Sequence, residues 1–156
     1  MTQEELTRLV ETYSPMLLRA ALTRLSTPAD AEDAVQEVFL KVLDKSPRFR
    51  DGEHAKAWLI RATLNQASDL RRKRRDDAPL DETIPAADGP GTDRLDLLSA
   101  VRALPEPYSI VIHLYYYEGY SIKEIARLLA LPSATVGTRL ARGRQRLRDM
   151  LKEEIA

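Results

Sequence analysis

The chain has 156 residues, no cysteine, and 24 basic and 24 acidic side chains, so its formal net charge is zero. This length permits one medium domain or two small ones. The lack of cysteine excludes disulfides and thiolate metal sites and fits a reducing compartment. No apolar run approaches the roughly 18 residues of a membrane span, and the first residues do not resemble a signal peptide. We therefore expect a cytoplasmic protein without a membrane segment.

The charges are unevenly distributed along the chain. Residues 61–80 hold six basic and three acidic side chains, residues 81–100 one and five, and residues 101–156 nine and six. Two basic segments separated by an acidic one suggest two separate contacts with a polyanion. Clustered charge that only keeps a protein soluble would give the same pattern, so this alternative stays open here.

The first half of the chain has helical periodicity and no sustained strand alternation. A first helix is expected over roughly 3–25, where Ser14-Pro15 marks either a kink or a fresh start capped by Ser14. A second is expected over 28–43, with Leu43 on its apolar face, and a third over 54–75. Between these two, Pro and Gly mark a loop.

A linker separates this half from the next. Residues 76–93 contain three prolines, two glycines and many acids, a composition too polar to bury a core. The sequence therefore predicts an all-α protein of two small helical domains, residues 1–75 and 94–156, joined by the acidic segment 76–93.

Four helices are expected in the second half. The first is capped by Thr92 or Asp93, and the second begins after Pro105 and ends at Glu118-Gly119, where glycine terminates the helix. The second helix also carries Tyr115–Tyr117, which we expect in the core or at an interface, and His113, expected to be a core or boundary histidine with a satisfied hydrogen bond.

The last two helices form a helix-turn-helix pattern. Ser121 and Glu124 have the spacing of a capping box, and after a short break Ser133 is expected to cap a basic helix that extends to about Glu154. In that basic helix the apolar stripe includes Val136 and Leu140. The opposite face presents polar and basic side chains, suited to phosphates and base edges in a major groove: Thr135, Thr138, Arg139, Arg142 and Arg146. A solvated basic face on a structural helix is the alternative.

Two glycines in this basic helix need separate explanations, because glycine costs about 1 kcal/mol relative to alanine in a helix. Gly143 falls on the inner stripe, where the missing side chain permits a close helix approach. Gly137 falls near the start of the helix on its outer side, where a long basic side chain would reach a phosphate. We find no reason in the sequence for Gly137.

Three stretches in this order resemble the extracytoplasmic-function sigma factors, the small two-domain sigma subunits of bacterial RNA polymerase. They are DAEDAVQEVFLKVL (30–43), AWLIRATLNQASDLRRKRR (57–75) and the segment 104–151, which contains the helix-turn-helix. The resemblance implies binding to core RNA polymerase, at the largest-subunit clamp and the flap, and to promoter DNA. The first domain would recognise and help to melt the −10 element, and the second would read the −35 element.

The resemblance also assigns site residues. Asp33, Gln36 and Glu37 would contact the polymerase, and the loop 45–56 would form a pocket for an extruded base of the unwound strand. Contacts to DNA on the −10 side would come from Asn65, Asp69, Arg71, Arg72 and Arg75. The five groove-facing side chains of the basic helix would serve the −35 side. Family members commonly have an anti-sigma partner, and nothing in the sequence identifies one.

Some residues depart from the family pattern. Gly137 stands where the family usually has Lys or Arg, Ala141 where a larger residue is common, and Ala130 where the turn often has Gly. No nucleophile–base pair, metal cluster or phosphate loop is found, so we expect no enzyme activity, no cofactor and no metal. A stand-alone helix-turn-helix regulator is the second interpretation, and a helical scaffold that binds only protein is the third.

Overall fold

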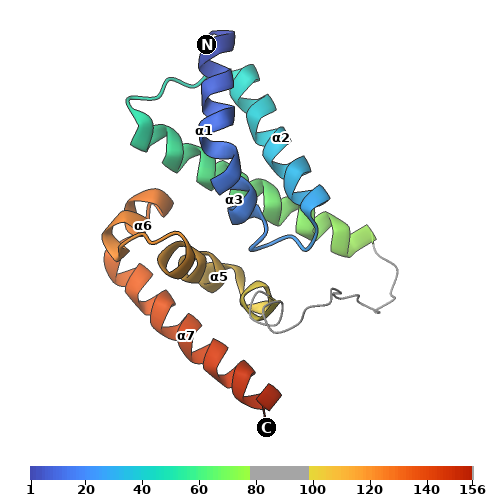
Figure 1. Cartoon of the computed structure of the whole chain (residues 1–156), viewed down its shortest axis with the longest axis vertical. Coiled ribbons are helices and arrows are strands. Elements are labelled where there is room, and N and C mark those ends of the chain that lie inside the picture. Colours follow the sequence, from blue (N-terminus) through green and yellow to red (C-terminus); the bar gives the residue numbers. More distant parts are fainter. Residues whose placement is uncertain (78–98, 156) are drawn as a thin grey trace.

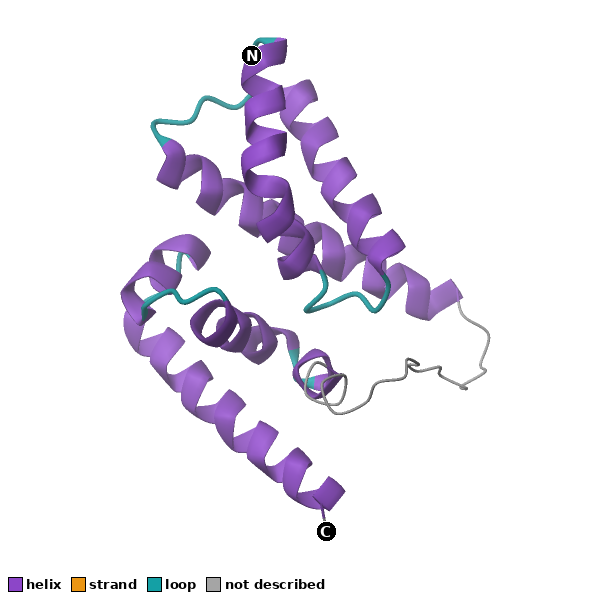
Figure 2. Ribbon diagram, viewed as in Figure 1, coloured by secondary structure: helices purple, strands orange, loops and turns teal. Residues whose placement is uncertain are grey.

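The computed structural model describes residues 1–77 and 99–155, and every regular element in this part is a helix (Figures 1 and 2). The predicted all-α class is therefore confirmed. The predicted domain bounds stay predictions, because most of the linker 76–93 and the expected cap at Thr92 or Asp93 lie outside the described residues.

Three helices form the N-terminal group: α1 (Gln3–Ala21), α2 (Pro28–Lys45) and α3 (Gly52–Asp77). Thr2 and Thr27 cap α1 and α2, each hydroxyl accepting a hydrogen bond from a backbone N–H three residues on. The helix α1 continues through the exposed Pro15, so a fresh start at Ser14 is wrong.

Residues 99–103 are helical and begin the C-terminal group. They are followed by α5 (Glu106–Ile112), which continues as a π-helical turn, η1 (His113–Tyr117), and then by α6 (Ile122–Leu129) and α7 (Ser133–Ile155). The predicted termination at Gly119 is confirmed by its left-handed φ of 80°. Ser133 is the first residue of α7, so the prediction that it caps the helix from outside is wrong.

One apolar cluster runs through both groups. Leu17 of α1, Leu59 of α3, Val111 of α5 and Ile125 of α6 are all completely buried and belong to it. In Figure 1, α5 and α6 lie on one side of the N-terminal group, and the most extensive contact between the groups is that of α3 with α6. The two helical groups therefore pack on each other, an arrangement that the sequence did not indicate.

Candidate functional sites

The first candidate surface is the outer face of α2. Asp33, Gln36 and Glu37 are all exposed there, one helical turn apart or adjacent. Leu40 and Leu43 continue the same stripe and are 57% and 56% exposed. Leu43 was expected on the apolar inner face; this is wrong, because Val38 and Val42 fill the inner face and turn Leu43 outward.

The leucine pair and the three polar groups together form a mixed apolar and acidic surface along the outer side of α2. Sequence reasoning missed these two leucines, although an i, i+3 apolar pair in line with the acidic stripe was visible. We call Asp33, Gln36, Glu37, Leu40 and Leu43 the α2 face. In contrast, Asp30 at the start of α2 is engaged by Arg74 from the end of α3, at 2.7 Å between carboxylate and guanidinium.

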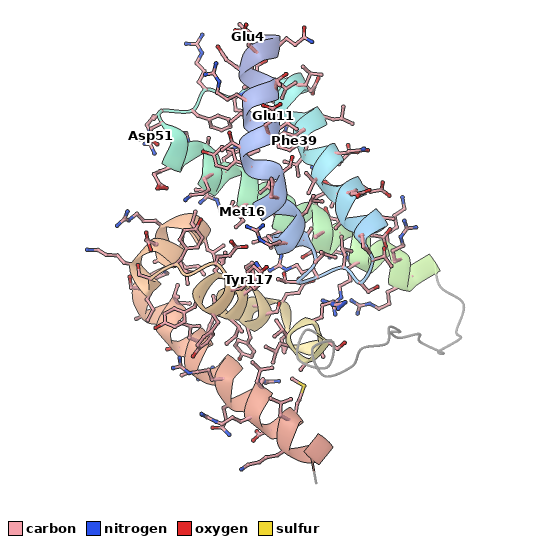
Figure 3. All side chains as sticks on the ribbon, viewed as in Figure 1. Glu4, Glu11, Met16, Phe39, Asp51 and Tyr117 are labelled. Carbon is pink, nitrogen blue, oxygen red and sulfur yellow. The ribbon has the colours of Figure 1, made fainter. Side chains whose placement is uncertain are left out.

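The second candidate site is a cavity of about 670 Å³ between the start of α1 and the loop before α3. Its lining includes Arg8, Tyr13, Arg48, Phe49 and Asp51. Figure 3 shows Asp51 at the tip of this loop, close to the start of α3. The predicted loop thus borders a cavity with aromatic, basic and acidic groups, a composition that can hold a base and its phosphates.

Local contacts fix the shape of the loop. The side chain of Asp51 accepts the backbone N–H of His54 at 2.8 Å and caps α3. The ring of Phe49 lies edge-on to those of His54 and Trp58, with centroids 5.5 and 5.7 Å apart. The hydroxyl of Tyr13 donates to the carbonyl of Gly52 at 3.2 Å. The cavity is therefore bounded by positioned side chains.

The second half of α3 carries the other residues predicted for the −10 side. Asn65, Asp69, Arg72 and Arg75 are exposed, and Arg72 forms an ion pair with Asp69 one turn earlier. Arg71 differs from them, because its guanidinium lies 3.6 Å from the carboxylate of Glu106 in α5. The structure thus leaves four of these five residues on an open surface and places Arg71 against the C-terminal group.

The third candidate site is the helix-turn-helix. The predicted capping box is present: the hydroxyl of Ser121 accepts the N–H of Glu124 at 3.1 Å, and the Glu124 carboxylate accepts the N–H of Ser121 at 2.8 Å. These hydrogen bonds lower the pKa of Glu124. Ala130 ends α6 in the left-handed region, with φ of 57°. The turn therefore has the geometry that glycine adopts without strain.

The exposed side of α7 forms one wall of a groove of about 600 Å³. The start of α5 forms the other wall, with Pro105, Pro107 and Tyr108, and the guanidinium of Arg146 lies over the Tyr108 ring, 5.1 Å from its centroid. All five predicted side chains of α7 line this groove: Thr135, Thr138, Arg139, Arg142 and Arg146. Sequence reasoning missed the wall from α5, whose only signal was the Pro-rich start of that helix.

The two glycines of α7 differ in their surroundings, as expected. A Cβ at Gly143 would lie 3.0 Å from a carbon of Ile112, so Gly143 allows α7 to approach α5. A Cβ at Gly137 would meet no atom of the described residues within 4 Å. Packing therefore explains Gly143 and gives no reason for Gly137.

The aromatic run in η1 is not in the core. Tyr115, Tyr116 and Tyr117 are 37%, 57% and 66% exposed, so the expectation of core residues is wrong; Leu114 is the buried residue of this turn. His113 is half-buried and lies 2.9 Å from the carboxylate of Glu118, which confirms a boundary histidine with a partner. The π-helical turn rotates the tyrosines out of the apolar stripe.

The described part of the chain contains no cluster of three or more His, Asp or Glu side chains that could hold a metal. None of its helices is long and apolar enough to cross a membrane. The described residues thus present three candidate sites: an acidic and apolar surface on α2, a cavity at the start of α3, and a basic groove on α7.

Comparison with known proteins identifies the class. The family model of sigma-70 region 2 matches residues 9–76, and that of sigma-70 region 4 matches residues 94–147. The chain is 27% identical to the ECF RNA polymerase sigma factor SigW of Bacillus subtilis, over 97% of this chain and 91% of the relative. It is 33% identical to SigM of Mycobacterium tuberculosis, over 92% of this chain and 76% of the relative.

A solved structure has the same fold. The sigma factor RpoE of Bartonella quintana, crystallised with the anti-sigma factor NepR, superimposes with a TM-score of 0.72 and 26% identity, over 96% of this chain and 98% of RpoE. The two helical groups with their C-terminal helix-turn-helix, together with the matches to sigma-70 regions 2 and 4, place the chain among the DNA-binding regulators of transcription. More narrowly, the chain belongs to the ECF RNA polymerase sigma factors, as its resemblance predicted, and its regions 2 and 4 are those that mediate promoter recognition.

Proposed function

We propose that each of the three sites binds one partner of a sigma factor. The α2 face docks on the clamp of core RNA polymerase, the cavity and the end of α3 hold the unwound −10 strand, and the groove on α7 reads duplex DNA at the −35 element. The observation that best supports this division is the groove itself, because five predicted contact residues of α7 line one open surface.

Each site has suitable chemistry for its proposed partner. The α2 face offers two carboxylates and exposed leucines to a basic and apolar protein surface. The cavity contributes the aromatic ring of Phe49, and farther along α3 Asn65, Arg72 and Arg75 are exposed for contacts with the nucleic-acid backbone. On α7, Arg142 and Arg146 suit phosphates and guanine edges, and Thr138 suits a smaller contact.

The partners and location follow from this role. We propose that the chain binds the flap of the polymerase through its C-terminal group, acts in the cytoplasm, where RNA polymerase works, and has no catalytic activity or cofactor of its own. Because RpoE of B. quintana binds an anti-sigma factor, we propose an anti-sigma partner for this chain as well.

Substitution of Arg142 tests the assignment of the groove. Arg142→Ala is expected to weaken binding to −35 duplex DNA by about tenfold, since one good base or phosphate contact is worth about 1–3 kcal/mol. Arg148→Ala is the matched control, because Arg148 is an exposed arginine of α7 that does not line the groove. Equal affinities of the two variants in fluorescence anisotropy would remove Arg142 from the site.

A further inference from the structure

The guanidinium of Arg146 is held by an aromatic ring instead of a carboxylate. It lies over the ring of Tyr108 in α5, 5.1 Å from the ring centroid. Asp149, three residues further along α7, has the spacing of an ion-pair partner, but its carboxylate accepts a hydrogen bond from Gln145 at 3.0 Å. Among the described residues, no carboxylate forms an ion pair with Arg146. The ring therefore supports the charge of Arg146 without neutralising it.

The carboxylate nearest to Tyr108 in the sequence is turned away from the groove on α7. Glu106 accepts the hydroxyl of Ser68 in α3 at 2.8 Å, and its other oxygen lies 3.6 Å from the guanidinium of Arg71. Among the described residues, the lining of the groove includes three arginines and no acidic side chain. The groove is therefore an electropositive surface that favours an anion.

Local contacts fix the position of Tyr108. Its backbone N–H donates to the carbonyl of Pro105 at 2.9 Å, and its half-buried side chain packs against the apolar cluster. A Cβ at Gly143 would lie 3.4 Å from the Cβ of Tyr108, so this glycine lets α7 approach α5 closely. Gly143 and Arg146 are three residues apart and therefore lie on the same side of α7. The close approach at Gly143 thus brings Arg146 beside a ring that is itself held in place.

The position of Arg146 along α7 indicates which part of a duplex it would meet. In helix-turn-helix proteins, the first residues of the second helix contact base edges in the major groove. Arg146 comes eleven residues after Thr135. It lies about 16 Å further along the helix, whereas the major groove is about 12 Å wide. Arg146 therefore falls beyond the base edges, at the level of the phosphates.

We propose that Tyr108 is a positioning residue for DNA binding, whose ring holds the guanidinium of Arg146 at the end of the groove for contact with a phosphate of duplex DNA. An unsupported arginine side chain loses rotamer freedom when it binds, and the ring removes part of this loss in advance. An ion pair would also restrict the side chain, but it would neutralise the charge that attracts the phosphate. This role rests on the proposed function of the groove and adds a residue of α5 to it.

Nuclear magnetic resonance of the free chain tests the stacking. Side-chain protons of Arg146 should be shifted upfield by the ring current of Tyr108, and their signals are identified by their loss in Arg146→Gln. The upfield shift should vanish in Tyr108→Leu and remain in Tyr108→Phe, which keeps the ring and removes the hydroxyl. Arg146 signals without an upfield shift in the natural chain would overturn the positioning role, and they would leave the proposed function of the groove untouched.

DNA binding tests what the stacking does. A mixed-sequence duplex with a fluorescent label is a sufficient probe, because phosphate contacts do not depend on sequence. Arg146→Gln is expected to bind about tenfold more weakly, with a slope of log K against log salt that is shallower by about 0.9. Tyr108→Leu is expected to bind about fivefold more weakly, and Tyr108→Phe as tightly as the natural chain. An unchanged slope in Arg146→Gln, or equal losses in Tyr108→Phe and Tyr108→Leu, would overturn the proposal.

Double variants separate positioning from a general loss of structure. Added to Arg146→Gln, Tyr108→Leu is expected to cause no further loss of affinity, because its effect acts through Arg146. Added to Arg142→Ala, it is expected to cause the same fivefold loss as in the natural chain, because Arg146 is still present. Equal further losses in both backgrounds would overturn the positioning role. Circular dichroism shows whether Tyr108→Leu keeps its helices, and if it does not, Tyr108→Met takes its place throughout.

The same measurements distinguish failure of this role from failure of the proposed function. If Arg142→Ala weakens binding to the duplex and Tyr108→Leu does not, the groove binds DNA without help from Tyr108. If Arg142→Ala and Arg146→Gln both bind as tightly as the natural chain, the proposed function of the groove is wrong, and the role of Tyr108 in DNA binding is wrong with it.

Discussion

At the scale of single residues, two positions in the helix-turn-helix carry residues that their backbone conformation disfavours: a glycine within a helix and an alanine in the left-handed region. Gly137 lies in the first turns of α7 with open space around it, and Ala130 adopts a left-handed conformation that usually belongs to glycine. Neither departure is explained by packing among the described residues. We therefore expect a substitution at Gly137 to strengthen DNA binding and a substitution at Ala130 to raise the free energy of unfolding. Each expectation can be tested with a single variant and a control.

Introducing a lysine at Gly137 should strengthen binding to duplex DNA. The helix gains about 0.8 kcal/mol of propensity, and the ammonium adds one phosphate contact, so the slope of log K against log salt should steepen by about 0.9. Gly137→Ala is the control, with the gain in stability but the original slope. An unchanged slope in Gly137→Lys, measured by anisotropy over a range of salt, would place Gly137 away from the DNA backbone.

Replacing Ala130 with glycine should stabilise the protein by up to about 1 kcal/mol. The left-handed conformation costs about 1–2 kcal/mol for alanine, and part of this gain is offset by the larger backbone entropy of glycine in the unfolded chain. Urea unfolding of Ala130→Gly and of the natural chain measures the difference. Ala141→Gly, at an exposed helical position of α7, is the control and should destabilise by a similar amount. A loss of stability in Ala130→Gly would contradict the strained turn.

At the scale of elements, the α2 face combines acidic groups and exposed leucines on a helix whose opposite side is buried. Thr27 and the proline that follows it fix the start of the helix, and Val38 and Val42 fix its rotation. The rotation decides which side chains of α2 face outward. The α2 face is therefore a product of core packing as much as of its own polar sequence.

Substitutions on the α2 face should weaken binding to core polymerase. Leu43→Ala and Asp33→Ala are each expected to raise the dissociation constant about tenfold, because central apolar and charged contacts of an interface are worth about 1–2 kcal/mol. Glu11→Ala, exposed on α1, is the control. Surface plasmon resonance with immobilised core polymerase measures all three. If Leu43→Ala binds as tightly as Glu11→Ala, the leucines do not belong to the docking surface.

Elements are also the level at which the sequence was most informative. Helix positions and the capping box at Ser121 and Glu124 could be predicted, because they depend on neighbours within a few residues. The exposure of Leu43 could not, since the apolar pattern of α2 is broad enough to fit two rotations. The exposure of Tyr115, Tyr116 and Tyr117 was missed because a π-helical turn breaks the period of 3.6 residues.

At the scale of the whole molecule, the feature beyond the reach of sequence reasoning is the packing of one helical group on the other. Arg19 and Glu118 are 99 residues apart in the chain, and neither has a local signal that marks it as a partner of the other. The family resemblance could predict two regions and their order. The relation between the regions depends on long-range contacts that no local pattern specifies.

The contact among Arg19, His113 and Glu118 should make the free energy of unfolding depend on pH. Burial lowers the pKa of His113 from its ordinary value of 6.5, against the opposing effect of Glu118. Burial also acts to raise the pKa of Glu118, but hydrogen bonds from Arg19 and His113 outweigh it and lower that pKa. The unfolded chain therefore binds more protons, and stability should fall as the pH drops below about 6.5.

Thermal unfolding between about pH 7.5 and 5.5 measures this effect. His113 faces Glu118 and stacks on Tyr117, and the charge of Arg19 also acts on it. His113→Gln is expected to flatten the pH dependence in this range, and His54→Gln, at the other histidine, to retain it. Equal slopes in the two variants would show that His113 does not cause the dependence.

The central claim is that this chain directs initiation by core RNA polymerase. Its most direct test is transcription of genomic DNA from the chain's own organism by purified core polymerase, with the start sites mapped. With the chain present, we predict new start sites preceded by two shared sequence elements at a fixed spacing, and no such sites with core alone. A chain that neither binds core nor creates start sites, yet binds duplex DNA tightly by itself, would contradict the claim and identify a stand-alone regulator.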